Sequence, residues 1–117
     1  MGVIRGAVCA ENTIGDISNK AVELFADILR RNGLSVGDVD AVIFSATNDL
    51  DACYPAEAVR KRFNMPNAAF MCFAEMSVCG GLDHCLRVGV IAPKLPQENC
   101  KHCYLGKAAV LRRDIAN

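Results

Sequence analysis

The sequence predicts a mixed α/β (α+β) fold in which a mixed β-sheet packs on one long helix. Two patterns carry this prediction. Apolar residues recur at helical spacing in one long segment, and shorter apolar or β-branched runs lie on both sides of it, separated by loop-like stretches. The 117 residues suit one hydrophobic core, because chains below about 150 residues usually fold as a single unit. We therefore expect one domain over residues 1–117.

The first strand is expected at 3–10, and the long helix follows after a short loop. Its apolar stripe begins near Ile17, where Asp16 or Ser18 can cap the first turn, and Gly33 suits its end. The stripe predicts that one face of this helix is buried in the core. It consists of Ile17, Ala21, Leu24, Phe25, Ile28 and Leu29.

The rest of the chain alternates apolar runs with breaks, which completes a mixed sheet of about four or five strands. The expected elements are a strand at 40–47, a helix at 55–63 begun by Pro55, a strand at 68–76, a tight turn at Gly80 and Gly81 leading to a short helical piece at 82–86, a strand at 87–92 and a partly extended segment at 104–112.

One long helix can cover only one face of such a sheet. The expected strands are apolar beyond simple alternation, a pattern typical of strands that are buried on both faces. The second face therefore needs a partner, and another copy of the chain is the simplest one. We expect a homo-oligomer.

Charge and hydropathy exclude several classes of partner. The formal net charge is zero, and the 13 basic and 13 acidic residues are scattered rather than grouped in blocks. This disfavours a nucleic-acid surface or a polybasic membrane patch. No signal-peptide pattern opens the sequence, and no run approaches the ~20 apolar residues of a membrane span. We expect a cytoplasmic protein that binds neither nucleic acid nor membrane.

The seven cysteines are expected to be reduced thiols, because their number is odd and several lie in apolar, strand-like runs. Cys100 and Cys103, in the stretch CKHC, have the spacing of half a zinc site or of a redox pair. A structural zinc needs four ligands, and no second CxxC is present. We expect no metal.

The common catalytic motifs are absent: there is no GxGxxG, P-loop, HExxH or nucleophile elbow. His84 and His102 lie in turn-like contexts and are expected to be solvated rather than catalytic. Taken singly, each polar residue in an apolar run has an ordinary structural explanation, such as a solvated arginine, a packing tyrosine or an ion pair. These residues are Arg5, Arg60, Cys72, Glu75, Arg87, Tyr104 and Arg112.

Five segments stand out in chain order: IRGA at 4–7, SATNDL at 45–50, YPAEAVR at 54–60, MCFAEMSVCGGLDHCLRV at 71–88 and HCYLGKAAVLRRD at 102–114. Together they resemble the bacterial monofunctional chorismate mutases of the trimeric α/β class. The resemblance runs nearly from end to end and keeps the spacing between motifs. It implies a chorismate-mutase-like pseudo-barrel trimer, with active sites in clefts between neighbouring subunits.

The resemblance implies the pericyclic (Claisen) rearrangement of chorismate to prephenate, a step of phenylalanine and tyrosine biosynthesis. One carbon–oxygen bond breaks as one carbon–carbon bond forms, so the reaction needs no nucleophile, metal or cofactor. We therefore expect no cofactor. This agrees with the absence of the common nucleophile and general-base motifs from the sequence.

The resemblance also implies roles for individual residues. Arg87 would face the ether oxygen of the substrate and stabilise the negative charge that develops there. Arg5 would hold a carboxylate through its planar fork, with Tyr104 donating a further hydrogen bond. Glu75 would accept a hydrogen bond from the substrate hydroxyl and orient Arg87. Cys72 would line the same side of the site as Glu75. The remaining substrate-binding residues would be Tyr54, Ala56 and Leu111 as an apolar wall, and Arg60 and Arg112 as positive charges at the mouth.

Three features depart from the pattern of the family. Glu57 stands where relatives tend to have lysine, which removes a positive charge from the edge of the cleft. Tyr54 replaces a common phenylalanine. Arg113 stands where relatives tend to have proline, and the sequence ends at Asn117, so we expect the C-terminal tail over the site to be short or loosely held.

Two other classes of function compete with this interpretation. A non-catalytic trimeric sensor of an anionic metabolite would bind its ligand with the same arginines. It would not need Arg87 aimed at an ether oxygen. A zinc or redox protein built on the cysteines would need a second ligand pair, which the sequence does not offer.

Overall fold

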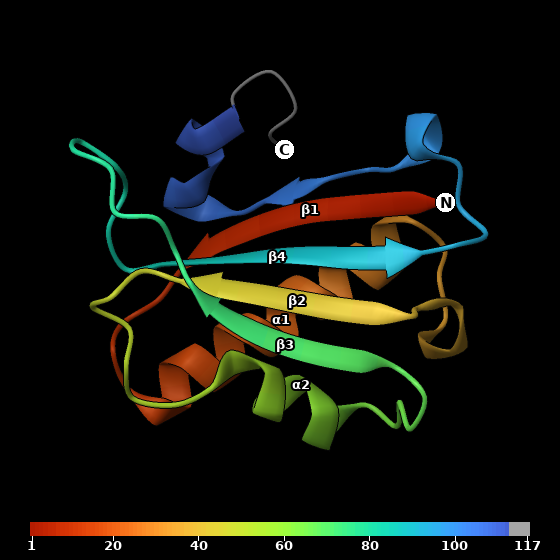
Figure 1. The fold of residues 1–117 in the computed structure, drawn as a ribbon, viewed down its shortest axis with the longest axis horizontal. Coiled ribbons are helices and arrows are strands. Elements are labelled where there is room, and N and C mark those ends of the chain that lie inside the picture. The colour runs from red at the N-terminus through yellow and green to blue at the C-terminus, as the bar shows by residue number, and fades with distance from the viewer. Residues whose placement is uncertain (113–117) are drawn as a thin grey trace.

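The computed structural model describes residues 1–112, which form a five-stranded sheet in the order β3-β2-β4-β1-β5. Strand β4 runs antiparallel to β1 and to β2, whereas β2 pairs with β3, and β1 with β5, in parallel. The sheet is therefore mixed, as predicted (Figure 1). Its strands are β1 (Gly2–Cys9), β2 (Ala41–Ala46), β3 (Ala69–Ala74), β4 (Cys85–Ala92) and β5 (Cys103–Tyr104).

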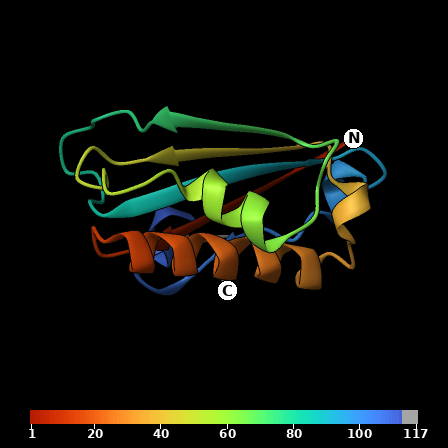
Figure 2. The same ribbon diagram turned by 90° about the horizontal axis from the view of Figure 1, so that it is seen from below.

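Two helices, α1 (Ile14–Arg31) and α2 (Pro55–Arg62), lie on the same face of the sheet (Figure 2). The predicted stripe of α1 is confirmed, since all six of its residues are buried. The rings of Phe25 and Phe63 meet edge to face with their centroids 5.1 Å apart. A single core therefore fills the space between the helices and one face of the sheet.

Gly6 on β1 explains how closely α1 approaches the sheet. A Cβ atom at this position would lie 2.9 Å from the carbonyl oxygen of Cys103 and 3.1 Å from a methyl group of Leu24. A larger residue would push the helix away from β1 or disturb the pairing of β1 with β5. The glycine of the IRGA segment thus serves packing on the helix side, while its neighbours Arg5 and Ala7 face the other side.

The opposite face of the sheet is largely bare, as the sequence predicts. Met71 and Phe73 on β3 are 50% and 53% exposed. Among the described residues, only the β1–β5 end is covered, by the 3-10 turn Gly106–Arg112. Ala108 of this turn forms a second, small buried cluster with Ala7, Cys85 and Tyr104. We call this side of the sheet the open face.

The start of the long helix differs from the prediction. The helix begins at Ile14 and not near Ile17, and its cap is Thr13, whose hydroxyl accepts a hydrogen bond from the backbone N–H of Asp16 at 3.0 Å. Neither Asp16 nor Ser18 caps it. The apolar stripe could not reveal this first turn, because Ile14 is 65% exposed and the next residue is a glycine.

One further local prediction is wrong, and a second is correct only in part. Residues 82–86 contain no helical piece, because β4 already begins at Cys85, which pairs with Cys9 of β1. The turn at Gly80 is present, with φ +79° at that residue. The segment 104–112 is extended only at Tyr104. Gly106, with φ +55°, then redirects the chain into the 3-10 turn.

None of the helices within residues 1–112 is long and apolar enough to cross a membrane.

Candidate active site

The pairing of the strands places several of the predicted site residues on the open face. Tyr104, Ala7, Arg87, Ser45 and Phe73 form one row across the sheet, from β5 to β3. Side chains alternate between the two faces of a strand, and directly paired residues share a face. Because Leu86, Val88 and Phe44 belong to the core on the helix side, this row faces away from the helices.

Arg5 lies in the adjacent row of the open face. It pairs with Gly89, two residues along β4 from Arg87, so the two arginines are diagonal neighbours about 7–8 Å apart at their backbones. Gly89 has no side chain to stand between them. The two predicted anion-binding groups therefore share one part of the open face.

Glu75 follows the end of β3 and reaches across β2 to Arg87. One carboxylate oxygen, Oε1, lies 3.3 Å from Nε of Arg87 and accepts a hydrogen bond of 2.5 Å from the hydroxyl of Ser45. The Arg87 side chain is 44% exposed, and ion pairs this open to solvent contribute about 1 kcal/mol or less to stability. The pair therefore adds little to the stability of the fold.

A pocket of about 320 Å³ lies beside this pair. Its volume is within the range of about 300–1,000 Å³ that is usual for small-molecule sites. Glu75 and Arg87 line it together with Cys85 and residues of the loop after β3. Burial raises the pKa of the Cys85 thiol to about 12, so this cysteine is protonated at neutral pH and offers no thiolate nucleophile.

A cationic cluster of Arg5, His102 and Arg112 lies near β5, at the end of the sheet opposite β3. The Nδ1 atom of His102 accepts a hydrogen bond of 2.9 Å from the backbone N–H of Arg5, and its Nε2 lies 3.5 Å from the Arg5 guanidinium. Burial, followed by the charges of Arg5 and Arg112, lowers the pKa of His102. The ring is therefore neutral at pH 7, and the positive charge of the cluster comes from the two arginines.

Tyr104 and Leu111 complete this group of residues. Tyr104 is 5% exposed within the small cluster under the 3-10 turn, and Leu111 packs against the same cluster. The structure thus brings one set of predicted residues together on and around the open face. This set, which we call the open-face group, is Arg5, Glu75, Arg87, Tyr104, Leu111 and Arg112.

The other predicted residues gather elsewhere, around α2 and the outer edge of β3. Cys72 pairs with Phe44 and packs against the core on the helix side, so within one chain it lies on the opposite face of the sheet from Glu75. A separate pocket of about 250 Å³ lies there. The predicted residues that line it, which we call the edge group, are Tyr54, Ala56, Arg60 and Cys72.

Glu57, the departure from the family pattern, also lines the pocket of the edge group. Its carboxylate lies 2.8 Å from Nζ of Lys61, one helical turn later. The hydrogen bond and charge of Lys61 lower the pKa of Glu57, so the acid is ionised at neutral pH. Lys61 therefore neutralises part of the negative charge that Glu57 adds at this edge.

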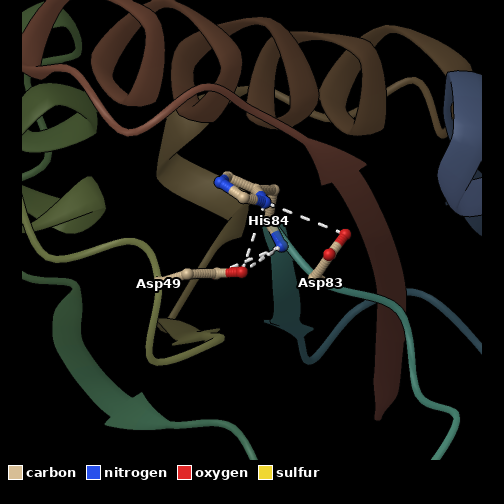
Figure 3. A group of neighbouring side chains, drawn as sticks. All are labelled: Asp49, Asp83 and His84. Carbon is tan, nitrogen blue, oxygen red and sulfur yellow. Dashed lines mark hydrogen bonds and ion pairs between the residues drawn. The ribbon is translucent and has the colours of Figure 1, made fainter.

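A cluster of Asp49, Asp83 and His84 lies where the chain enters β4 (Figure 3). The backbone N–H of His84 donates to both carboxylate oxygens of Asp49, at 3.1 and 3.0 Å, and Nδ1 of the ring lies 3.2 Å from Asp49. His84 adopts φ +48°, a left-handed conformation. These contacts hold the start of β4 against the end of β2, and we assign the cluster this structural role.

Sequence reasoning missed two residues that contact the open-face group. Ser45 belongs to the SATNDL segment but has no predicted role, and His102 is predicted to be solvated. A usable signal for Ser45 is its alternation with the buried Val42 and Phe44, which places it on the same face as Arg87. The nearness of His102 to Arg5 follows only from the parallel pairing of β5 with β1.

The lowered pKa of His102 predicts a loss of stability in mild acid. The unfolded histidine has an ordinary pKa near 6.5 and binds its proton more readily than the folded one, so the free energy of unfolding should fall as the pH drops below that value. Protonation also removes the Nδ1 acceptor for Arg5. Urea unfolding of the wild type and of His102→Gln at about pH 7.5 and about pH 5.5 measures this. The wild type should lose more stability than the variant, and equal losses would contradict the assignment.

Comparisons with known proteins show the family to which the chain belongs. The family model described as chorismate mutase type I matches residues 1–115. The chain is 38% identical over 115 residues to the chorismate mutase AroH of Bacillus subtilis (strain 168), which covers 97% of this chain and 91% of that protein. It is 35% identical over 115 residues to the chorismate mutase AroH of Thermus thermophilus, which covers 96% of this chain and 93% of that protein.

A solved structure supports the same conclusion. A chorismate mutase from Clostridium thermocellum matches the fold with a TM-score of 0.88 and 35% identity, covering 94% of this chain and 99% of that one. The predicted family, fold class and enzymatic function are confirmed. The chain therefore belongs to the type I chorismate mutase family, and its function is that of a chorismate mutase.

Proposed function

We propose that the chain acts as a homotrimer that converts chorismate to prephenate in clefts between neighbouring subunits. The observation that carries this proposal is the separation of the predicted site residues into two groups. Within one chain Cys72 of the edge group and Glu75 of the open-face group lie on opposite faces of the sheet. A second copy that sets its edge group against the open face of the first would enclose one small substrate.

The exposed surfaces support such an assembly. Met71 and Phe73 leave an apolar strip on the open face, and Tyr54 is 71% exposed beside the outer edge of β3. That edge has no neighbouring strand within the described residues. A contact between two different surfaces, open face on one copy and edge on the next, closes into a ring when the rotation between copies allows it. Three copies would then form three equivalent clefts.

The open-face group matches the charge of the substrate. Chorismate carries two carboxylates, and the cationic cluster presents Arg5 and Arg112 around the neutral His102. An arginine fork can hold a carboxylate through two hydrogen bonds. Tyr104 lies in the row adjacent to Arg5 and would donate to the same carboxylate. The net charge of the chain is zero, so this local concentration of guanidinium groups provides the attraction.

Arg87 and Glu75 would act on the reacting part of the substrate. The ether oxygen gains negative charge as its bond to carbon breaks, and the Arg87 guanidinium would stabilise that charge. Glu75 would accept a hydrogen bond from the ring hydroxyl while its other oxygen stays in contact with Arg87. Because the reaction is a rearrangement within one molecule, no proton or electron has to leave the substrate.

Magnitudes show that positioning must supply much of the catalysis. Losing one donor to a developing oxyanion costs roughly 3–4 kcal/mol, whereas enzymes lower barriers by at least about 8 kcal/mol. Holding reacting atoms in place contributes about 7–11 kcal/mol in well-oriented cases. The carboxylate clamps that fix the enolpyruvyl arm over the ring are therefore part of catalysis as well as of binding.

The edge group of the neighbouring subunit would close the cleft. Tyr54 and Ala56 would supply an apolar wall, and Cys72 would line it. Arg60 would add positive potential at the mouth of the cleft. From the first subunit, Leu111 would extend the apolar wall and Arg112 would add to the positive potential. Glu57 stands at the same rim. Its pairing with Lys61 limits the repulsion that it exerts on a dianion.

Purified protein should consume chorismate, measured as the loss of its absorbance, and should yield prephenate as the product. The reaction should proceed without added metal or cofactor. A well-folded trimer that binds chorismate without converting it would instead favour the alternative, a non-catalytic sensor of an anionic metabolite. The role in phenylalanine and tyrosine synthesis follows from the family, and the expected cytoplasmic location stays a prediction.

A further inference from the structure

We propose that Ser45 is a positioning residue, which fixes Glu75 so that one carboxylate oxygen serves Arg87 and the other faces the substrate. This inference deepens the proposed function and rests on the role of Glu75 in it. Ser45 lies on β2 between Arg87 of β4 and Phe73 of β3, in the central row of the open face. Its hydroxyl donates a hydrogen bond of 2.5 Å to Oε1 of Glu75.

Within residues 1–112, both contacts of the Glu75 carboxylate fall on the same oxygen atom. Oε1 accepts from Ser45 and lies 3.3 Å from Nε of Arg87. A carboxylate offers about four lone-pair positions on its two oxygens. Oε2 is therefore left to accept a hydrogen bond from a ligand hydroxyl, while the orientation of the group is set by two donors on Oε1.

The ion pair with Arg87 is a weak restraint on the side chain of Glu75. Glu75 follows the last residue of β3, where its backbone N–H still donates to the carbonyl of Ala46 at 2.9 Å, and the Arg87 side chain is 44% exposed. Exposed pairs of this kind are weak. The Ser45 hydroxyl is anchored to a central strand, and a hydrogen bond from it to a charged acceptor is a stronger and more directional restraint.

The test is a double-mutant cycle on the reaction. Ser45→Ala should lower kcat/KM about 10-fold to 100-fold, as expected for loss of a hydrogen bond to a charged group, whereas Ser45→Thr should keep most of the activity because it keeps the donor. In a Glu75→Ala background, Ser45→Ala should cause little further loss, because the group it positions is gone. The matched control is Ser18→Ala, on α1 at the far side of the sheet, which should leave kcat/KM unchanged.

Each outcome decides the inference. An unchanged kcat/KM in Ser45→Ala, or an equal loss with and without Glu75, would overturn it. A crystal structure of the free Ser45→Ala variant adds a readout that does not depend on activity, and it should show the Glu75 carboxylate turned away from its wild-type position. If the wild type itself were inactive, the proposed function would fail, and this structure would still decide whether Ser45 orients Glu75. If Ser45→Ala did not fold, a loss of activity in the folded Ser45→Thr variant would contradict the inference.

Discussion

Replacing Arg87 with alanine is expected to lower kcat by about 10²–10³-fold while changing KM far less. The reason is that the ether oxygen carries little charge in bound chorismate and gains it only as the bond breaks. An interaction that exists mainly in the transition state affects kcat and hardly affects ground-state binding. Steady-state kinetics on purified Arg87→Ala, with a light-scattering check of the oligomer, measure the effect.

The control for this variant is Arg30→Ala. Arg30 lies at the end of α1, on the helix side, and pairs with Asp27. It should behave like the wild type. An Arg87→Ala enzyme with an unchanged kcat and a raised KM would show that the guanidinium only binds the ground state, and the assignment to the ether oxygen would then be withdrawn.

Replacing Phe73 with aspartate is expected to abolish both the trimer and the activity. Phe73 is 53% exposed on the open face of the single chain, so an aspartate there remains hydrated and should not disturb the fold. In the assembled protein the same position would be enclosed, and burying an unpaired carboxylate is costly. Light scattering should report a monomer, and circular dichroism should report a folded one.

Ile14→Asp is the matched control, because Ile14 is 65% exposed at the start of α1, away from the open face. An acid in the first turn of a helix is also compatible with the helix dipole. This variant should remain an active trimer. A monomeric Phe73→Asp protein that still converted chorismate at the wild-type rate would contradict a site built between subunits.

The elements that could be predicted from the sequence are those fixed by local patterns. The stripe of α1 is correct because the period of apolar residues reports directly on which side of a helix is buried. The elements that were misread depend on distant partners. Residues 82–86 seemed helical, yet pairing with Cys9, far away in the sequence, makes Cys85 the first residue of a strand. Local propensity cannot reveal such a constraint.

The site residues show the same division between features that the local sequence reveals and features that depend on distant partners. The types and order of the arginines, Glu75 and Tyr104 could be compared with a known family. The contacts that orient these groups could not, because Ser45 meets Glu75 across 30 positions of the chain and His102 meets Arg5 across 97. The placement of Cys72 on the opposite face from Glu75 also depends on the register between β2 and β3.

In the proposed trimer each site combines the open-face group of one subunit with the edge group of the next. Arg87→Ala inactivates the open-face group, and Arg60→Glu, which reverses an exposed charge on α2, should inactivate the edge group. Each variant alone would form weakly active trimers. In a co-refolded equal mixture, about one quarter of the interfaces would join an intact Arg87 to an intact Arg60.

The most direct measurement is therefore the activity of this mixture. We predict recovery to as much as about one quarter of the wild-type rate, and no recovery when Arg87→Ala is mixed with Arg5→Ala, because both defects then lie in the same group. A mixture of Arg87→Ala and Arg60→Glu that is only as active as the average of its two components, although mixed trimers have formed, would contradict the shared site.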